Sequence, residues 1–127
     1  MPDPSSAVSS PTRLSLRLVF GDAAMLGPGK VELLERIRDT GSISAAGRQM
    51  RMSYKRAWML VVEMNTAFST PLVDSTRGGP NGGGAKLTAA GHTVIAQYRS
   101  LEATVVDTGA AQIATLSGML KDISGQK

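Results

Sequence analysis

The sequence contains no cysteine and a single histidine, His92. Without cysteine the chain can form no disulfide, no thiolate metal site and no cysteine nucleophile, which is compatible with a reducing compartment. A single histidine disfavours zinc binding and histidine-based catalysis, and we expect His92 to be a surface residue without chemistry. No paired-carboxylate spacing or metal-ligand cluster is visible either. We therefore expect no catalytic residues, no metal site and no enzymatic activity.

Long apolar runs and aromatic residues are also scarce. No uninterrupted apolar segment approaches the roughly 20 residues that span a bilayer, so no membrane segment is predicted. Aromatics make up 4% of the residues and hydrophobics 42%, which predicts a core of Leu, Val, Ile, Met and Ala in a single domain of 127 residues. Residues 1–12 are rich in Pro and Ser and lack an apolar h-region. They predict a disordered tail rather than a signal peptide, in a cytoplasmic protein.

Positive charge is concentrated in one part of the chain. The formal net charge is +4, but between Thr40 and Ser100 seven Lys and Arg residues stand against two acidic ones, so this stretch holds the whole excess. A localised basic excess is typical of polyanion binding. The alternative is a solvated face that keeps the protein soluble. The seven cations are Arg48, Arg51, Lys55, Arg56, Arg77, Lys86 and Arg99.

Residues 40–64 have the pattern of two helices joined by a tight turn. Gly41 is placed to end a preceding helix. A short helix is then predicted up to Met50, with Ser42 or Ser44 as its N-cap. Its middle is made of small residues that allow a second helix to cross closely: Ala45, Ala46 and Gly47.

The second of these helices has two different parts. Ser53 is its predicted N-cap, after a connection at residues 51–52, and it runs from about Tyr54 to Ala67. Apolar residues recur along it at three- and four-residue spacing and predict a buried face: Ala57, Leu60, Val61, Met64 and Phe68. Its first turn is polar or cationic instead: Ser53, Tyr54, Lys55 and Arg56. Helix-turn-helix proteins present side chains to the major groove of DNA from such a turn.

A glycine-rich hairpin is predicted after the helix pair. Short strands are expected at residues 72–76 and 85–87, and five of the eight residues from 77 to 84 are glycine. Beside a helix-turn-helix such a hairpin is a wing, whose Arg77 and Lys86 would reach phosphates or the minor groove. The glycines allow the backbone to approach phosphate closely. The alternative is a solvent-exposed loop tip.

Three further elements flank this region. Residues 13–20 alternate between apolar and polar and predict a strand with one buried face, whose partner would lie some 55 residues further on. After a connection at residues 21–25, a helix is predicted at residues 30–39, with Pro28 near its N-terminus.

A long helix is predicted from residue 89, with Thr88 as its N-cap, and Gly109 separates it from a second amphipathic segment. The two apolar stripes could complete the core of the monomer or pair with a second copy, and burial in a homodimer is favoured. The expected dimerisation residues are Val94, Tyr98, Leu101, Val105, Ile113, Leu116 and Leu120. Residue 123 ends this region, and residues 124–127 form a polar tail.

In this order the elements define a winged helix-turn-helix: mostly α, with a small antiparallel β wing, an N-terminal strand and a long C-terminal dimerisation helix. The sequence resembles the N-terminal DNA-binding domain of the ModE family of molybdate-responsive transcriptional regulators, which is related in plan to LysR-type regulators. The matching blocks are Gly41–Ser44, Ser53–Lys55 with Ala57-Trp58, Glu63–Asn65, the glycines after Arg77, and Leu87-Thr88 with Gly91.

The resemblance implies a transcriptional regulator, of repressor type and with a molybdenum-related regulon, that binds an inverted repeat in double-stranded DNA as a homodimer. Full-length members resemble this domain followed by molybdate-binding barrel domains. Because the sequence ends at Lys127, we expect a stand-alone DNA-binding domain with no cofactor, for which molybdate acts only indirectly and any small-molecule effector is unknown. The alternatives are a winged-helix protein-interaction module and a non-specific DNA-binding protein.

Each candidate DNA-contacting residue has an expected role. Lys55 is placed to donate to guanine, while Arg48, Arg51 and Arg56 suit phosphate contacts. Tyr54 would touch a phosphate or a thymine methyl, or else pack against the first helix. Trp58 is expected in the core, and Met59 is expected to face outward and touch bases or DNA sugar. The full set is Ser42, Ser44, Arg48, Arg51, Ser53, Tyr54, Lys55, Arg56, Met59, Arg77, Gly78, Gly79, Gly83 and Lys86.

Overall fold

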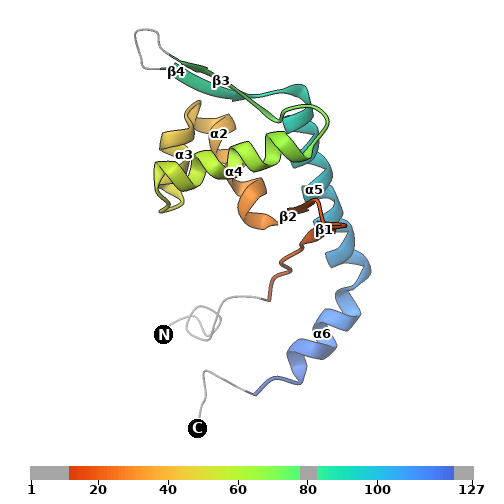
Figure 1. Ribbon diagram of the computed structural model, residues 1–127. Helices are drawn as coiled ribbons and strands as arrows, with labels where there is room; N and C mark the ends of the chain where they lie inside the picture. The colour runs from red at the N-terminus through yellow and green to blue at the C-terminus, as the bar shows by residue number, and fades with distance from the viewer. Residues whose placement is uncertain (1–11, 78–82, 122–127) are drawn as a thin grey trace, which may run out of the picture. The chain divides into compact units, whose positions relative to one another are not determined.

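The computed structural model describes residues 12–77 and 83–121. The described part of the chain forms five helices and two antiparallel strand pairs, shown in Figure 1. It divides into two units, residues 16–99 and residues 100–127 together with 1–15. The elements in chain order are β1 (Leu18–Phe20), β2 (Ala24–Leu26), α2 (Pro28–Thr40), α3 (Ile43–Gln49), α4 (Tyr54–Ala67), β3 (Val73–Arg77), β4 (Gly83–Leu87), α5 (Ala89–Thr108) and α6 (Ala110–Gly118).

Helix α2 is longer than the sequence pattern predicts, and its ends explain why. Pro28 occupies the first turn, where a missing backbone N–H leaves no hydrogen bond unmade. At the other end Gly41 adopts φ +72°, a left-handed conformation that favours glycine, and its N–H donates to the carbonyl of Ile37. Between these ends α2 contributes four fully buried side chains to the core: Val31, Leu33, Leu34 and Ile37.

The helix pair α3–α4 forms where the sequence predicts it. Ser42, rather than Ser44, caps α3 by accepting a hydrogen bond from the N–H of Ala45 at 3.0 Å. Ser53 caps α4 by accepting from the N–H of Arg56 at 3.0 Å. A Cβ at Gly47 would lie 2.9 Å from the Cβ of Ala57, so the two helices cross too closely for a larger residue at that position.

Strands β3 and β4 form the base of the predicted wing. They pair antiparallel from Val73 opposite Leu87 to Arg77 opposite Gly83. The side-chain amide of Asn65, in α4, accepts from the N–H groups of Leu72 and Val73 and donates to the carbonyl of Val73. Asn65 therefore ties the start of the wing to the helix that precedes it.

The predicted N-terminal strand is wrong in extent and in partner. Only Leu18–Phe20 is a strand, and it pairs with Ala24–Leu26 rather than with a segment some 55 residues away. Residues 21–23 form the turn, so the connection expected at 21–25 is partly strand. Phe20 packs edge-on against Phe68, at the end of α4.

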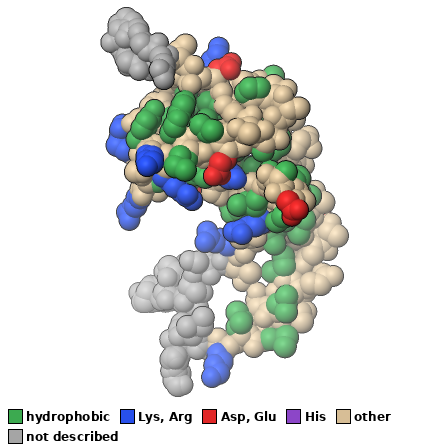
Figure 2. Space-filling view, in the orientation of Figure 1, with side chains coloured by type: hydrophobic (Ala, Val, Ile, Leu, Met, Phe, Trp, Pro, Cys, Tyr) green, Lys and Arg blue, Asp and Glu red, His purple; other side chains and the backbone are tan. Residues whose placement is uncertain are grey.

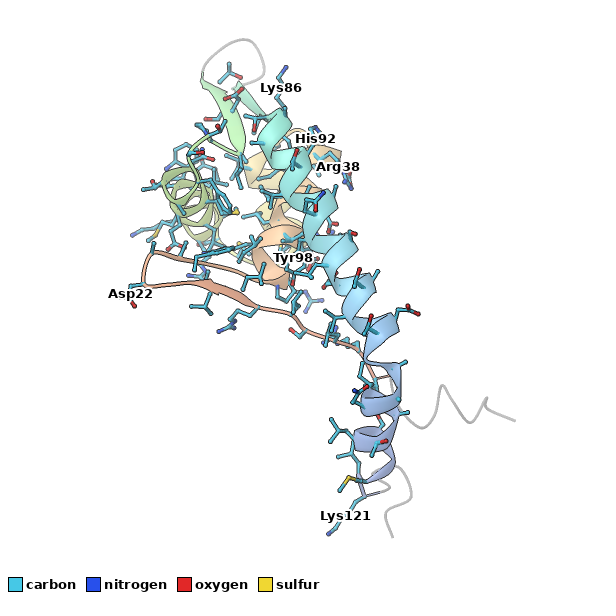
Figure 3. The ribbon with its side chains drawn as sticks, turned by 90° about the vertical axis from the view of Figure 1, so that its right-hand side faces the viewer. Asp22, Arg38, Lys86, His92, Tyr98 and Lys121 are labelled. Carbon is cyan, nitrogen blue, oxygen red and sulfur yellow. The ribbon has the colours of Figure 1, made fainter. Side chains whose placement is uncertain are left out.

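The first part of α5 completes the core of residues 16–99. Thr88 caps the helix, as predicted, by accepting from the N–H of Gly91. Gly91 lies so close to the backbone of Leu72 that a Cβ at position 91 would be 2.3 Å from the carbonyl oxygen of Leu72. Tyr98 is 2% exposed, lies on the side of α5 toward α2 (Figure 3) and donates its hydroxyl to the carbonyl of Leu16.

The second unit contains the end of α5 and the whole of α6. None of its described residues from 100 to 121 is buried. Large apolar side chains are exposed along it instead: Leu101, Val106, Leu116, Met119 and Leu120. Among the described residues no helix is both long enough and apolar enough to cross a membrane.

Candidate nucleic-acid interface

The first turn of α4 carries exposed positive charge. Lys55 and Arg56 directly follow the capping residue Ser53, and both side chains are exposed. Among the described residues no acidic side chain forms an ion pair with either of them. This turn is therefore free to offer two cations and the helix N-terminus to an anionic partner.

Three further candidates lie on α3 and on the turn that follows it. Arg48 is exposed and donates to the hydroxyl of Ser44 at 2.9 Å, so this side chain is held against its own helix. Arg51 is exposed in the turn with φ +60°, the one non-glycine residue with positive φ in the described chain. Lys and Arg side chains gather over the end of the fold where α3 and the start of α4 lie (Figure 2).

Trp58 does not lie in the core, which corrects the expectation based on its position beyond the first turn of the helix. It is 37% exposed and stacks on Tyr54, one helical turn earlier, with ring centroids 6.4 Å apart and planes 17° from parallel. Tyr54 is 57% exposed. Met59 faces outward, as predicted, and Val62 is exposed too. The exposed part of α4 therefore includes large apolar side chains beyond its cationic first turn.

Among the wing side chains that the structure describes, Lys86 is the exposed cation. Lys86 lies on β4 directly opposite Asp74 on β3, and both are exposed. Arg77 ends β3 opposite Gly83, which begins β4. Gly78 and Gly79, two of the predicted DNA-contacting residues, lie outside the described residues.

Arg99 does not belong to the exposed positive charge. Its guanidinium donates two hydrogen bonds, at 2.9 and 2.8 Å, to the carboxylate of Glu35 on α2. Hydrogen bonding from Arg99 is the main cause that holds the pKa of Glu35 below its ordinary value, although burial opposes it. Arg99 therefore joins α5 to α2. Among the described side chains of this region, the basic surface consists of Arg48, Arg51, Lys55, Arg56 and Lys86.

The predicted dimerisation residues fall into two groups. Tyr98 is buried in the core of its own chain, so its side chain has no surface left for a second subunit. The sequence pattern left two roles open for the apolar stripe of this helix, pairing with a second copy or completing the core of the monomer. Tyr98 completes the core of the monomer. The others keep exposed or half-buried side chains: Val94, Leu101, Val105, Ile113, Leu116 and Leu120.

Sequence reasoning missed Asn65 as a positioning residue. Its three hydrogen bonds join α4 to the wing, so the two elements predicted to contact DNA are held in one arrangement. The signal was visible, because Asn65 stands at the end of one of the sequence blocks that match the ModE family. A polar residue near the end of an amphipathic helix is uninformative without that match.

The fold and this surface together define a winged helix-turn-helix DNA-binding domain. Comparison with known protein families agrees: residues 29–92 match the model of the bacterial regulatory helix-turn-helix proteins of the lysR family. The chain belongs to this family. The matched segment runs from the start of α2 to the first turn of α5, and it includes α3, α4 and the wing.

Individual relatives are regulators or molybdenum-linked proteins by name. The chain is 49% identical over 82 residues to the molybdenum-pterin-binding protein MopB of Rhodobacter capsulatus. This match covers 65% of the length of this chain and 30% of the length of the relative. It is 41% identical over 90 residues to the molybdenum transport protein ModE of Azotobacter vinelandii, covering 71% and 33%. Against the DNA-binding transcriptional dual regulator ModE of Escherichia coli K12 it is 41% identical over 71 residues, covering 56% and 27%. The chain thus matches about a third of the length of these relatives.

Proposed function

We propose that this protein is a transcriptional regulator that recognises a specific sequence in double-stranded DNA by placing the start of α4 in the major groove. The observation that carries this proposal is the first turn of α4, where two exposed cations follow a capped helix N-terminus and form no ion pair with any acidic side chain that the structure describes. Lys55 is placed to donate to a guanine edge, and Arg56 to a phosphate. Arg48, Arg51 and Lys86 contact flanking phosphates.

The protein acts as a homodimer on an inverted repeat. The exposed apolar residues from Leu101 to Leu120 are the surface that a second copy covers. A two-fold dimer presents two α4 helices to successive major grooves, so half-sites lie about one helical turn or two apart. Mutation of Leu116 and Leu120 to serine is expected to yield monomers in sedimentation experiments while leaving the helical content of residues 16–99 intact.

The regulated genes are connected with molybdenum, and regulation is of the repressor type. The connection with molybdenum rests on the names of the relatives, which mention molybdenum transport and molybdenum-pterin binding. The repressor type rests on the resemblance to the ModE family stated from the sequence. This step is tested by measuring operator affinity with and without molybdate, and by comparing transcripts with and without the gene. A regulon without molybdenum-related genes would contradict it.

The salt dependence of DNA binding tests the contacts of α4. A K55A/R56A double variant is expected to bind the preferred duplex more weakly. Its slope of log K against log salt is expected to be smaller by about one unit for each phosphate that the variant no longer neutralises. The matched control is Arg17→Ala, which removes an exposed cation next to β1. Unchanged affinity and slope in the double variant would contradict this placement of α4.

A further inference from the structure

Four large apolar side chains are exposed together on α4: Tyr54, Trp58, Met59 and Val62, which we call the α4 apolar face. Tyr54, Trp58 and Val62 follow one another at intervals of four residues, so they lie on neighbouring turns of one side of the helix. Met59 lies one turn from Lys55, which places it next to the cationic first turn. The opposite side of α4 is buried through Ala57, Leu60, Val61 and Met64.

The charges around this face limit what it can contact. The cationic turn precedes it, whereas Glu63 lies beyond Met59, with its carboxylate 3.4 Å from the ammonium of Lys30. The Lys30 ammonium also donates to the carbonyl of Met25 and is held in place. Because Lys30 balances the charge of Glu63, the uncompensated charge lies in the first turn of α4, and that turn is where a phosphate is favoured. A duplex that binds there can bring the edges of its bases to Trp58 and Met59.

We propose that the α4 apolar face contacts the 5-methyl groups of thymines in the major groove, with Trp58 and Met59 as specificity-determining residues. The inference rests on the proposed function and extends it to the chemistry that is recognised. The thymine methyl is the apolar group on the major-groove edge of the bases, and apolar side chains distinguish it from the other edges. The half-site therefore contains thymine beside the base pair that Lys55 contacts.

The exposure and stacking of Trp58 leave its ring available to a partner outside the protein's own core. Trp58 leans on Tyr54 within the same helix, so its ring orientation is fixed before any partner arrives. A preorganised aromatic side chain loses little rotamer freedom on binding. Because α4 is held by Asn65 and by its serine cap, the face moves with the cationic turn as one unit.

Removal of single methyl groups from DNA tests the inference directly. Each thymine of the half-site enriched from a random duplex library is replaced in turn by deoxyuridine. Wild-type protein is expected to lose about fourfold in affinity at each methyl that it contacts. For Trp58→Ala or Met59→Ala, one of these replacements is expected to have no further effect. The matched control Lys55→Ala is expected to bind more weakly but to keep the full methyl effect.

Fluorescence gives a second readout, because Trp58 is the one tryptophan of the sequence. The enriched duplex is expected to protect it from quenching by acrylamide, and an unrelated duplex bound at low salt is expected to protect it less. Trp58→Phe, which keeps an apolar ring, is expected to retain most of the binding and the methyl effect. Helical circular dichroism establishes that each variant folds.

The outcomes separate this inference from the proposed function. Specific duplex binding without any effect of thymine methyls overturns the inference and leaves the proposed function in place. A methyl effect that persists unchanged in both the Trp58 and Met59 variants also overturns it, because other side chains would then contact the methyl groups. Failure to enrich any duplex overturns both.

Discussion

Residues 16–99 and residues 100–121 differ in how much apolar surface the chain covers by itself. All 17 buried apolar residues in the described part of the chain belong to the first region. In the second region no described residue is buried, and large apolar side chains such as Leu116 are exposed. The first region can hold a binding surface in a fixed arrangement without help, whereas the second has apolar surface available for a partner. The contrast predicts different effects on stability for the same type of substitution in the two regions.

Leucine truncation is expected to give the largest contrast. Leu34→Ala removes a fully buried side chain of α2 and is expected to lower the free energy of unfolding by about 2–5 kcal/mol. Leu116→Ala, on the exposed side of α6, is expected to change it by less than about 0.5 kcal/mol but to weaken dimerisation. Urea denaturation and sedimentation check the pair. If the two substitutions lowered the free energy of unfolding equally, the proposed difference in burial between the two regions would be contradicted.

Addition of a single methyl group gives the next contrast. Gly91→Ala places a Cβ 2.3 Å from the carbonyl oxygen of Leu72, and this backbone clash is expected to lower the free energy of unfolding by about 3 kcal/mol. Gly118→Ala, in α6, meets nothing within 4 Å and is expected to be neutral or to increase helix stability by about 0.5 kcal/mol. Thermal unfolding followed by circular dichroism measures both, and tolerance of the alanine at position 91 would be inconsistent with this close approach.

The Glu35–Arg99 pair makes stability depend on pH. Because the pKa of Glu35 is lowered in the folded protein, the unfolded chain binds its proton more readily. The stabilisation is therefore complete above the ordinary pKa of 4.5 and is lost as the pH falls toward the folded value. Glu35→Gln is expected to cost about 1 kcal/mol at pH 7, since the pair is partly exposed, and to reduce the loss of stability in acid. An unchanged pH profile in the variant would show that the pair has no such role.

Arg51 is expected to give the smallest effect on stability, with the opposite sign. Its φ of +60° costs a non-glycine residue about 1 kcal/mol, so Arg51→Gly is expected to stabilise the fold by about 0.5–1 kcal/mol. DNA binding is expected to weaken, because the variant has one cation fewer to neutralise a phosphate. Arg51→Ala keeps the backbone penalty and removes the charge, and is expected to weaken binding without the gain in stability. A glycine variant with undiminished DNA affinity would show that the arginine does not bind DNA.

The sequence predicts the helix pair well because its signals are local. Serine caps, a helix-ending glycine and apolar spacing mark α3 and α4 within a few residues. The strand pair β1–β2 was misjudged because three residues are too few for alternation to specify a partner. The position of Trp58 was misjudged because its place beyond the first turn suggested burial, although it lies roughly 100° around the helix from the centre of the buried side. Arg99 looked like surface charge because its partner, Glu35, lies 64 residues away in the sequence.

The DNA-contacting residues are a prediction of a different kind. Exposure of Lys55, Arg56 and Met59 agrees with the roles assigned from the sequence, but exposure is also compatible with solvation. A direct test of DNA binding is therefore the measurement that matters most. Selection of duplexes by the wild-type protein from a random library, at two salt concentrations, is expected to enrich a two-fold symmetric site with half-sites about one or two helical turns apart. Absence of enrichment at both salt concentrations would contradict sequence-specific recognition of DNA by this winged helix-turn-helix.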